Sequence, residues 1–135
     1  MDQVSPQIEE KRLRNSVAVC TRTLNHLGIL GYSGHVSVRL PNSNQLLIQA
    51  FNQSRAAVTP DDLIVADAEG LSLRGPEGLN PPDEIFIHTE IYKTRADVEA
   101  VFHFHPDVAT LFTLVDGVEL LPVKSHAARW ASGIP

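Results

Sequence analysis

The chain has 135 residues, of which 43% are hydrophobic and 20% are charged, as in an ordinary soluble globular domain. Its formal net charge of −5, with acidic and basic residues interspersed, excludes the basic face that nucleic-acid binding requires. It contains no run of membrane-spanning length, no signal-peptide core, and a single cysteine, which allows no disulfide within the chain. We therefore expect one cytoplasmic domain, residues 1–135, with neither a nucleic-acid nor a membrane partner.

The first predicted helix has a start signal and a stop signal. Ser5 and Pro6 form the pattern of an N-cap followed by a proline at the first helical position. Apolar residues then recur at helical spacing until Gly28 and Gly31, and glycine commonly ends a helix. The helix is expected to run from Pro6 to one of these glycines.

Short strands follow the glycine-rich loop 31–35. Residues 36–40 alternate in polarity like a half-buried strand, and a turn cluster connects them to residues 45–50 as a hairpin. Residues 64–66 and 71–73 flank a second turn. These patterns predict two hairpins.

A second helix is predicted from a cluster of start signals. Asn80 is a candidate N-cap, and two prolines and two acids follow it, the acids lying near the positive end of the helix dipole. A helix that continues to about Thr94 places Glu84, His88 and Tyr92 along one face. Each of these three side chains also has a simple structural interpretation, as a first-turn acid or a packed residue.

Residues 101–106 form a short apolar run that predicts a buried strand. Because alternate side chains point the same way, His103 and His105 are expected on one side, with Phe102 and Phe104 in the core on the other. Two imidazoles at this spacing can reach one metal ion. Hydrogen bonding can also satisfy them, so the spacing alone leaves both interpretations open.

The last part of the chain is expected to contain both helices and a strand. Pro106 and Asp107 begin a predicted helix through Leu114, and a turn leads to a strand over 118–123 and a helix start over 124–130. The order of helices and hairpins favours an α/β sandwich with much antiparallel pairing.

Four motifs occur in order along the chain: Gly34-His35-Val36-Ser37-Val38-Arg39, Val58-Thr59-Pro60, Pro82-Asp83-Glu84 with His88 and Tyr92, and His103-Phe104-His105-Pro106. Together they resemble the class II aldolase/adducin family. The resemblance implies an α/β fold, an α/β/α sandwich whose largely antiparallel central sheet is flanked by helices. It also implies a small-molecule substrate and a homo-oligomer, a tetramer with active sites between subunits.

The resemblance implies a divalent metal, commonly Zn²⁺, with Mn²⁺, Co²⁺ or Fe²⁺ as other candidates. His103 and His105 match two of the ligands, and a third histidine is expected beyond Pro135, so that the domain is expected to be incomplete at its C-terminus. Glu84 matches the catalytic acid/base. His126 lies near the position of a proton-donating tyrosine and is a second candidate catalytic residue.

The resemblance also points to substrate-binding residues, which are Gly34, His35, Thr59 and Asp83. Sugar-phosphate aldolases of the family carry an asparagine where this chain has His35 and a serine pair where it has Pro82 and Asp83. Those positions help to cradle a phosphate, which an aspartate repels. The substitutions favour a substrate without phosphate, such as a dihydroxy-aromatic acid.

The expected activity is that of a metal-dependent lyase, an aldolase or decarboxylase acting on a hydroxy-carbonyl or dihydroxy-aromatic acid through a metal-stabilised enediolate. Three alternatives stay open: a sugar-phosphate aldolase, a non-catalytic interaction module like the adducin head, and a non-haem iron oxygenase that performs oxidative decarboxylation.

Overall fold

A five-stranded antiparallel sheet forms the centre of the fold, with the strand order β4-β3-β2-β1-β5. The computed structural model describes residues 5–118. The strands are β1 His35–Arg39, β2 Leu46–Gln49, β3 Leu63–Ala66, β4 Ser72–Arg74 and β5 Ala100–His103. The helices are α1 Pro6–His26, the 3-10 turn η1 Pro60–Asp62, α2 Ile85–Thr94 and α3 Asp107–Leu114.

Helix α1 begins and ends where its sequence signals predict. The Ser5 hydroxyl accepts a hydrogen bond from the Ile8 N–H at 3.4 Å, and Pro6 is the first helical residue. Just beyond the C-terminal end, Gly28 has a φ of 70°, the left-handed conformation in which glycine avoids the clash of a side chain.

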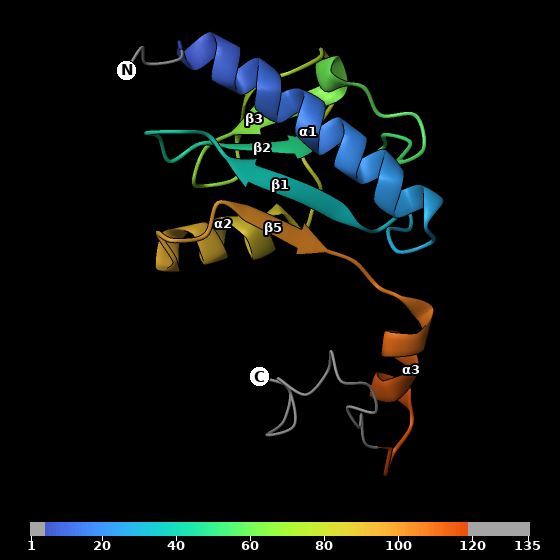
Figure 1. Ribbon diagram of the computed structural model, residues 1–135. Coiled ribbons are helices and arrows are strands. Elements are labelled where there is room, and N and C mark those ends of the chain that lie inside the picture. The colour runs from blue at the N-terminus through green and yellow to red at the C-terminus, as the bar shows by residue number, and fades with distance from the viewer. Residues whose placement is uncertain (1–4, 119–135) are drawn as a thin grey trace, which may run out of the picture. The chain divides into compact units, whose positions relative to one another are not determined.

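The two long helices cover opposite faces of the sheet (Figure 1), as the predicted layered α/β fold requires. Strands β2 and β3 are buried along their whole length, so both of their faces are covered. On one face Leu47 and Val65 pack with Val17 of α1. On the other face Ile48 packs in a cluster with Tyr92 of α2. The sheet is therefore the middle layer between two apolar cores.

Helix α2 starts later than its sequence predicts. The expected cap at Asn80 is wrong, since the helix begins at Ile85 and Glu84 occupies the capping position. The Asn80 carbonyl instead accepts the N–H of Phe51 at 2.9 Å. This backbone pairing holds Asn80 against the loop that follows β2, and the chain turns at Pro82 before the helix can begin.

Strand β5 is shorter and more open than expected. It ends at His103, so His105 follows the strand. The expected core positions of Phe102 and Phe104 are wrong, because these side chains are 47% and 38% exposed. The strand lies at an edge of the described sheet, and Val101 packs in the α2 core while the next side chain points to the opposite face.

The chain divides into two compact units, residues 1–105 and residues 106–135. In the second unit, α3 matches the predicted helix, and Gly117 has the positive φ, 74°, of the predicted turn. The expected strand over 118–123, apart from its first residue, and the helix start over 124–130 lie outside the described residues. Within the described part, no helix has the length and hydropathy needed to cross a membrane.

Candidate active site

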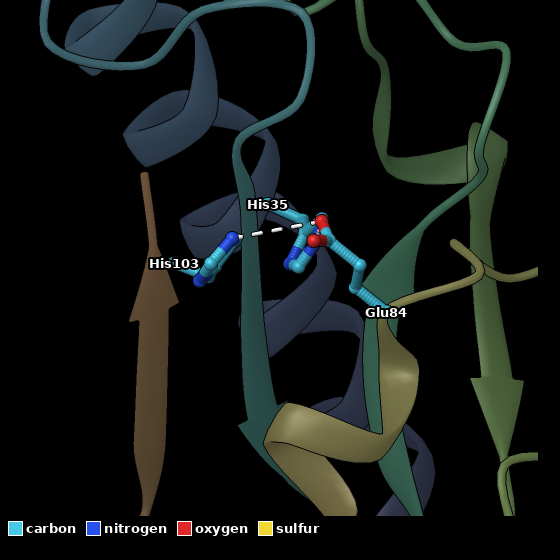
Figure 2. A group of neighbouring side chains, drawn as sticks. All are labelled: His35, Glu84 and His103. Atoms are coloured by element: carbon cyan, nitrogen blue, oxygen red, sulfur yellow. Dashed lines mark hydrogen bonds and ion pairs between the residues drawn. The ribbon is translucent and has the colours of Figure 1, made fainter. Parts of the chain in front are cut away.

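Three polar side chains from distant parts of the chain meet on the α2 face of the sheet. His35, the first residue of β1, is paired with His103, the last residue of β5. Glu84 reaches both from the start of α2, its Oε2 lying 3.3 Å from His35 Nε2 and 3.5 Å from His103 Nε2 (Figure 2). The candidate ligand atoms of all three lie within 4.8 Å of one another.

His105 joins this group through His103. The Nε2 atoms of the two imidazoles lie 2.9 Å apart, and their rings are nearly perpendicular. Two ligands of one tetrahedral or octahedral ion, each bound at about 2.0–2.1 Å, are about 2.9–3.4 Å apart. Imidazole nitrogens with a carboxylate oxygen are also a donor set that suits zinc and other divalent transition metals. The residues present therefore fit a divalent metal.

Behind His35 a chain of short hydrogen bonds runs into the core beneath α2. His35 Nδ1 lies 2.6 Å from His88 Nε2, and His88 Nδ1 lies 2.6 Å from Ser37 Oγ. Ser37 Oγ in turn lies 2.7 Å from the Tyr92 hydroxyl. All four side chains are buried, and all of these polar groups are paired with one another.

The Glu84 carboxylate determines the direction of every proton in this chain of hydrogen bonds. An ionised carboxylate only accepts, so His35 Nε2 carries a proton and its Nδ1 accepts one from His88. The remaining His88 nitrogen then accepts from the Ser37 hydroxyl, which accepts from Tyr92. In this arrangement His35 is a donor to Glu84 and has no nitrogen left for a metal.

Burial keeps the members of this chain uncharged. Desolvation, assisted by the neighbouring imidazoles of His35 and His103, lowers the pKa of His88 to about 3. Burial also lowers the pKa of His35, although the hydrogen bond that His35 donates to Glu84 acts in the opposite direction. For Tyr92, burial raises the pKa to about 12. Near neutral pH the two histidines and the tyrosine are therefore neutral.

Gly34 is required by close packing next to His35. A Cβ at this position would lie 2.6 Å from Cδ1 of Leu30 and 3.2 Å from the carbonyl oxygen of His103. The Gly34 N–H donates to the carbonyl of Gly31, and its own carbonyl accepts from Gln49 and Arg55. The backbone of Gly34 is thus occupied within the protein, and its predicted role in substrate binding stays a prediction.

A pocket of about 390 Å³ adjoins the site, and its lining includes His35, Asp83, Glu84 and His105. Larger hollows, of about 490 Å³ and 450 Å³, lie elsewhere on the described surface and contain neither Glu84 nor the His103–His105 pair. The chemistry of the side chains, and not the volume, therefore identifies the smaller pocket as the candidate substrate site.

The predicted substrate-binding residue Thr59 is not brought to this pocket. The hydroxyl of this exposed residue donates to the Asp62 carboxylate at 2.7 Å, within the cap of η1. His126 lies outside the described residues. Sequence reasoning also missed the two partners of His88, which are His35 and Ser37, although the alternation along β1 places both on one face.

Residues 15–135 match the family model of the class II aldolase and adducin N-terminal domain. The chain is 28% identical over 115 residues to an L-fuculose phosphate aldolase of Methanococcus maripaludis, covering 84% of this chain and 60% of that protein. It is 34% identical over 100 residues to a 3,4-dihydroxyphthalate decarboxylase of Arthrobacter keyseri, covering 69% of this chain and 40% of that protein. The chain thus spans about half the length of the curated relatives it matches.

Solved structures agree with the fold. An aldolase II superfamily protein from Pseudomonas syringae superposes with a TM-score of 0.82 and 28% identity, covering 96% of this chain and 52% of that one. L-fuculose 1-phosphate aldolase from Glaciozyma antarctica gives a TM-score of 0.85 at 23% identity, covering 98% of this chain and 55% of that one. At that lower identity the likeness concerns the fold alone.

Proposed function

The chain belongs to the class II aldolase and adducin family, and we propose that it is a divalent-metal-dependent carbon–carbon lyase. One observation carries the proposal. The Glu84 carboxylate lies 3.5 Å from His103, whose Nε2 faces that of His105 at 2.9 Å. A candidate acid/base beside two candidate metal ligands is unnecessary in an interaction module like the adducin head, so it favours the enzyme.

His103 and His105 would hold the metal, with Glu84 near enough to approach it. When bound, a divalent ion such as Zn²⁺ supplies Lewis-acid polarisation of a chelating hydroxy-carbonyl group. His35 orients Glu84 by donating from Nε2 to Oε2 and is itself held by His88. This arrangement positions the carboxylate on the side of the site that faces the pocket, because Glu84 and His35 both line it.

Glu84 is the proton carrier of the proposed reaction. Its Oε atom takes the proton of a substrate hydroxyl, the bond from the ring or chain carbon to the departing group breaks, and the electron pair stays on that carbon. Glu84 then delivers its proton to the carbon. In a decarboxylation the departing group is carbon dioxide, and solvent restores the hydroxyl proton.

We favour a substrate without phosphate, and specifically a dihydroxy-aromatic acid. Asp83 lines the pocket beside Glu84, and a second carboxylate there repels a phosphate dianion. The similarity to a 3,4-dihydroxyphthalate decarboxylase supports this choice. The similarity to an L-fuculose phosphate aldolase keeps a ketose 1-phosphate as the competing substrate.

We propose that other copies of this chain supply part of the site. We propose a homo-oligomer, a tetramer, with active sites between subunits, in which His126 serves proton transfer. A further histidine would complete the metal site.

Purified protein tests the proposal directly. We expect release of carbon dioxide from 3,4-dihydroxyphthalate or a related dihydroxy-aromatic acid, and about one bound divalent ion per chain by elemental analysis. The His103→Ala variant should lose the ion, while a control His26→Ala variant, altered in α1 on the opposite face of the sheet, should keep it. Rapid cleavage of a ketose 1-phosphate alone would identify an aldolase, and oxygen consumption would identify an oxygenase. Protein without metal in both the wild type and the variant would contradict the proposal.

A further inference from the structure

The pocket beside Glu84 is lined by a buried cation that has no counter-ion among residues 5–118. Arg55 is only 5% exposed and lies in the loop after β2. Its Nε donates to the Gly34 carbonyl at 2.9 Å, and its Nη1 donates to carbonyls of the same loop, that of Phe51 at 3.0 Å among them. No carboxylate of the described residues forms an ion pair with this guanidinium.

One end of the guanidinium is unused. Within residues 5–118, Nη2 of Arg55 makes no hydrogen bond, although every buried side-chain nitrogen and oxygen there has a partner. Nη2 therefore reaches solvent, and the pocket is the hollow that Arg55 lines. Carbonyl oxygens satisfy the N–H groups but leave the net charge uncompensated, and burial consequently lowers the pKa of Arg55.

Aromatic side chains stand next to this cation. Tyr32 and Phe51 also line the pocket and meet edge to face, with ring centroids 6.4 Å apart. The guanidinium carbon of Arg55 lies 5.7 Å from the centre of the Tyr32 ring. The pocket thus combines an aromatic wall with a charged donor, which suits an aromatic acid.

Asp83 limits the charge that the pocket can accept. Its exposed carboxylate lines the same hollow as the Glu84 carboxylate and the Arg55 guanidinium, so that two anionic side chains stand beside one cation. A phosphate dianion gains from the arginine but is repelled by the aspartate, whereas a carboxylate carries half the charge and is repelled less. This arrangement therefore favours a carboxylate with a neighbouring donor such as a hydroxyl, which Asp83 can accept.

We propose that Arg55 is a specificity-determining residue that binds the carboxylate of an aromatic acid through Nη2, against the Tyr32–Phe51 wall. This inference rests on the proposed function for its substrate class and deepens it. It assigns Arg55 a role besides that of supporting the loop through its carbonyl contacts.

Ligand binding tests this role without turnover and without metal, so its outcome is independent of whether the chain is a lyase. Benzoate is the probe, benzamide is its uncharged counterpart of the same shape, and inorganic phosphate is the competing anion. In protein labelled with ¹⁵N-arginine, benzoate is expected to shift the Arg55 side-chain signals, assigned with an Arg55→Lys variant. Benzamide and phosphate at equal ionic strength should leave these signals unchanged.

The Arg55→Gln variant is expected to bind benzoate about tenfold more weakly, because it loses a charge-assisted hydrogen bond. An Arg39→Gln variant is the matched control, since Arg39 also donates to backbone carbonyls and lies 4.7 Å from the Tyr92 ring centre, but lines a different hollow. Should Arg55→Gln fail to fold, the signal shifts of the wild type decide alone. The proposal is overturned if benzoate leaves the Arg55 signals in place, or if phosphate or benzamide shifts them equally.

Discussion

His35 and His103 stand directly opposite each other on adjacent antiparallel strands, and their rings stack with centroids 4.8 Å apart. The contact joins the glycine-rich loop before β1 to the histidine motif at the end of β5. It also places His35 next to the candidate metal ligand without giving it a free nitrogen, since His88 and Glu84 occupy both of its ring nitrogens. The two histidines therefore have different predicted roles.

Replacing His35 by Gln should separate these roles. Because His35 donates to Glu84 in the described arrangement, the variant is expected to keep its metal and to lose activity through a misplaced carboxylate. In contrast, His103→Ala should lose the metal. Elemental analysis and activity assays on both variants check this. Loss of metal from His35→Gln to the extent seen in His103→Ala would instead make His35 a ligand.

The Glu84→Gln variant should lose activity while it retains metal. An amide of the same shape neither takes nor delivers a proton, and removal of a general acid/base typically lowers the rate by about 10²–10⁴-fold. Activity on a dihydroxy-aromatic acid and metal content are the measurements. Glu90→Gln serves as the control, because this exposed glutamate of α2 pairs with Lys93 on the helix surface. Equal activity of the two variants would exclude Glu84 as the proton carrier.

Tyr92 should ionise only in strongly alkaline solution. The chain has two tyrosines, so a Tyr32→Phe variant leaves Tyr92 as the single phenol. Its absorbance at 295 nm should titrate near pH 12, because burial raises the pKa of Tyr92 to about 12. In denaturant the midpoint should return to about 10. A folded-state midpoint near 10 would show that the hydroxyl is accessible to water.

The same shift predicts how stability depends on pH. Below about pH 10 the phenol is protonated in both states, and its favourable burial is fully present. Between about pH 10 and 12 the unfolded chain releases the proton while the folded chain keeps it. The free energy of unfolding should therefore fall as pH rises, by up to about 1.4 kcal/mol per pH unit from this group. A Tyr92→Phe variant should show a correspondingly shallower decline in denaturant titrations over this range.

Shortening a buried side chain of the sheet should lower the free energy of unfolding far more than shortening an exposed one. Leu47 is completely buried on β2 and packs in the α1 cluster, so Leu47→Ala leaves a cavity and should lower the free energy of unfolding by about 2–5 kcal/mol. Leu73, on the edge strand β4, is 48% exposed, and Leu73→Ala should change it by about 0.5 kcal/mol or less. Urea denaturation measures both, and similar losses would contradict the described sheet order.

Local signals were sufficient for most of the elements. The start of α1 at Ser5 and Pro6 and the hairpins follow from chemistry within a few residues, namely capping, proline geometry and alternation. The start of α2 was misplaced because Asn80 pairs with Phe51, and no local pattern reveals a partner so distant in the chain. The exposure of Phe102 was missed for a similar reason, since only the order of the strands shows that β5 lies at an edge of the sheet formed by residues 5–118.

The sequence by itself determined which chemistry is present: two histidines at alternate positions, and a glutamate at a helix start with a histidine and a tyrosine at the next helical turns. Residues spaced by the period of a strand or a helix lie on one face of that element, so their proximity can be predicted from the sequence. Only the tertiary structure decided which of these groups meet. The β1–β5 register places His35 against His103, and the α2 packing joins His88 to Ser37. The burial of Arg55, which forms no ion pair within the described part of the chain, was likewise decided by folding, because burial depends on contacts between distant segments.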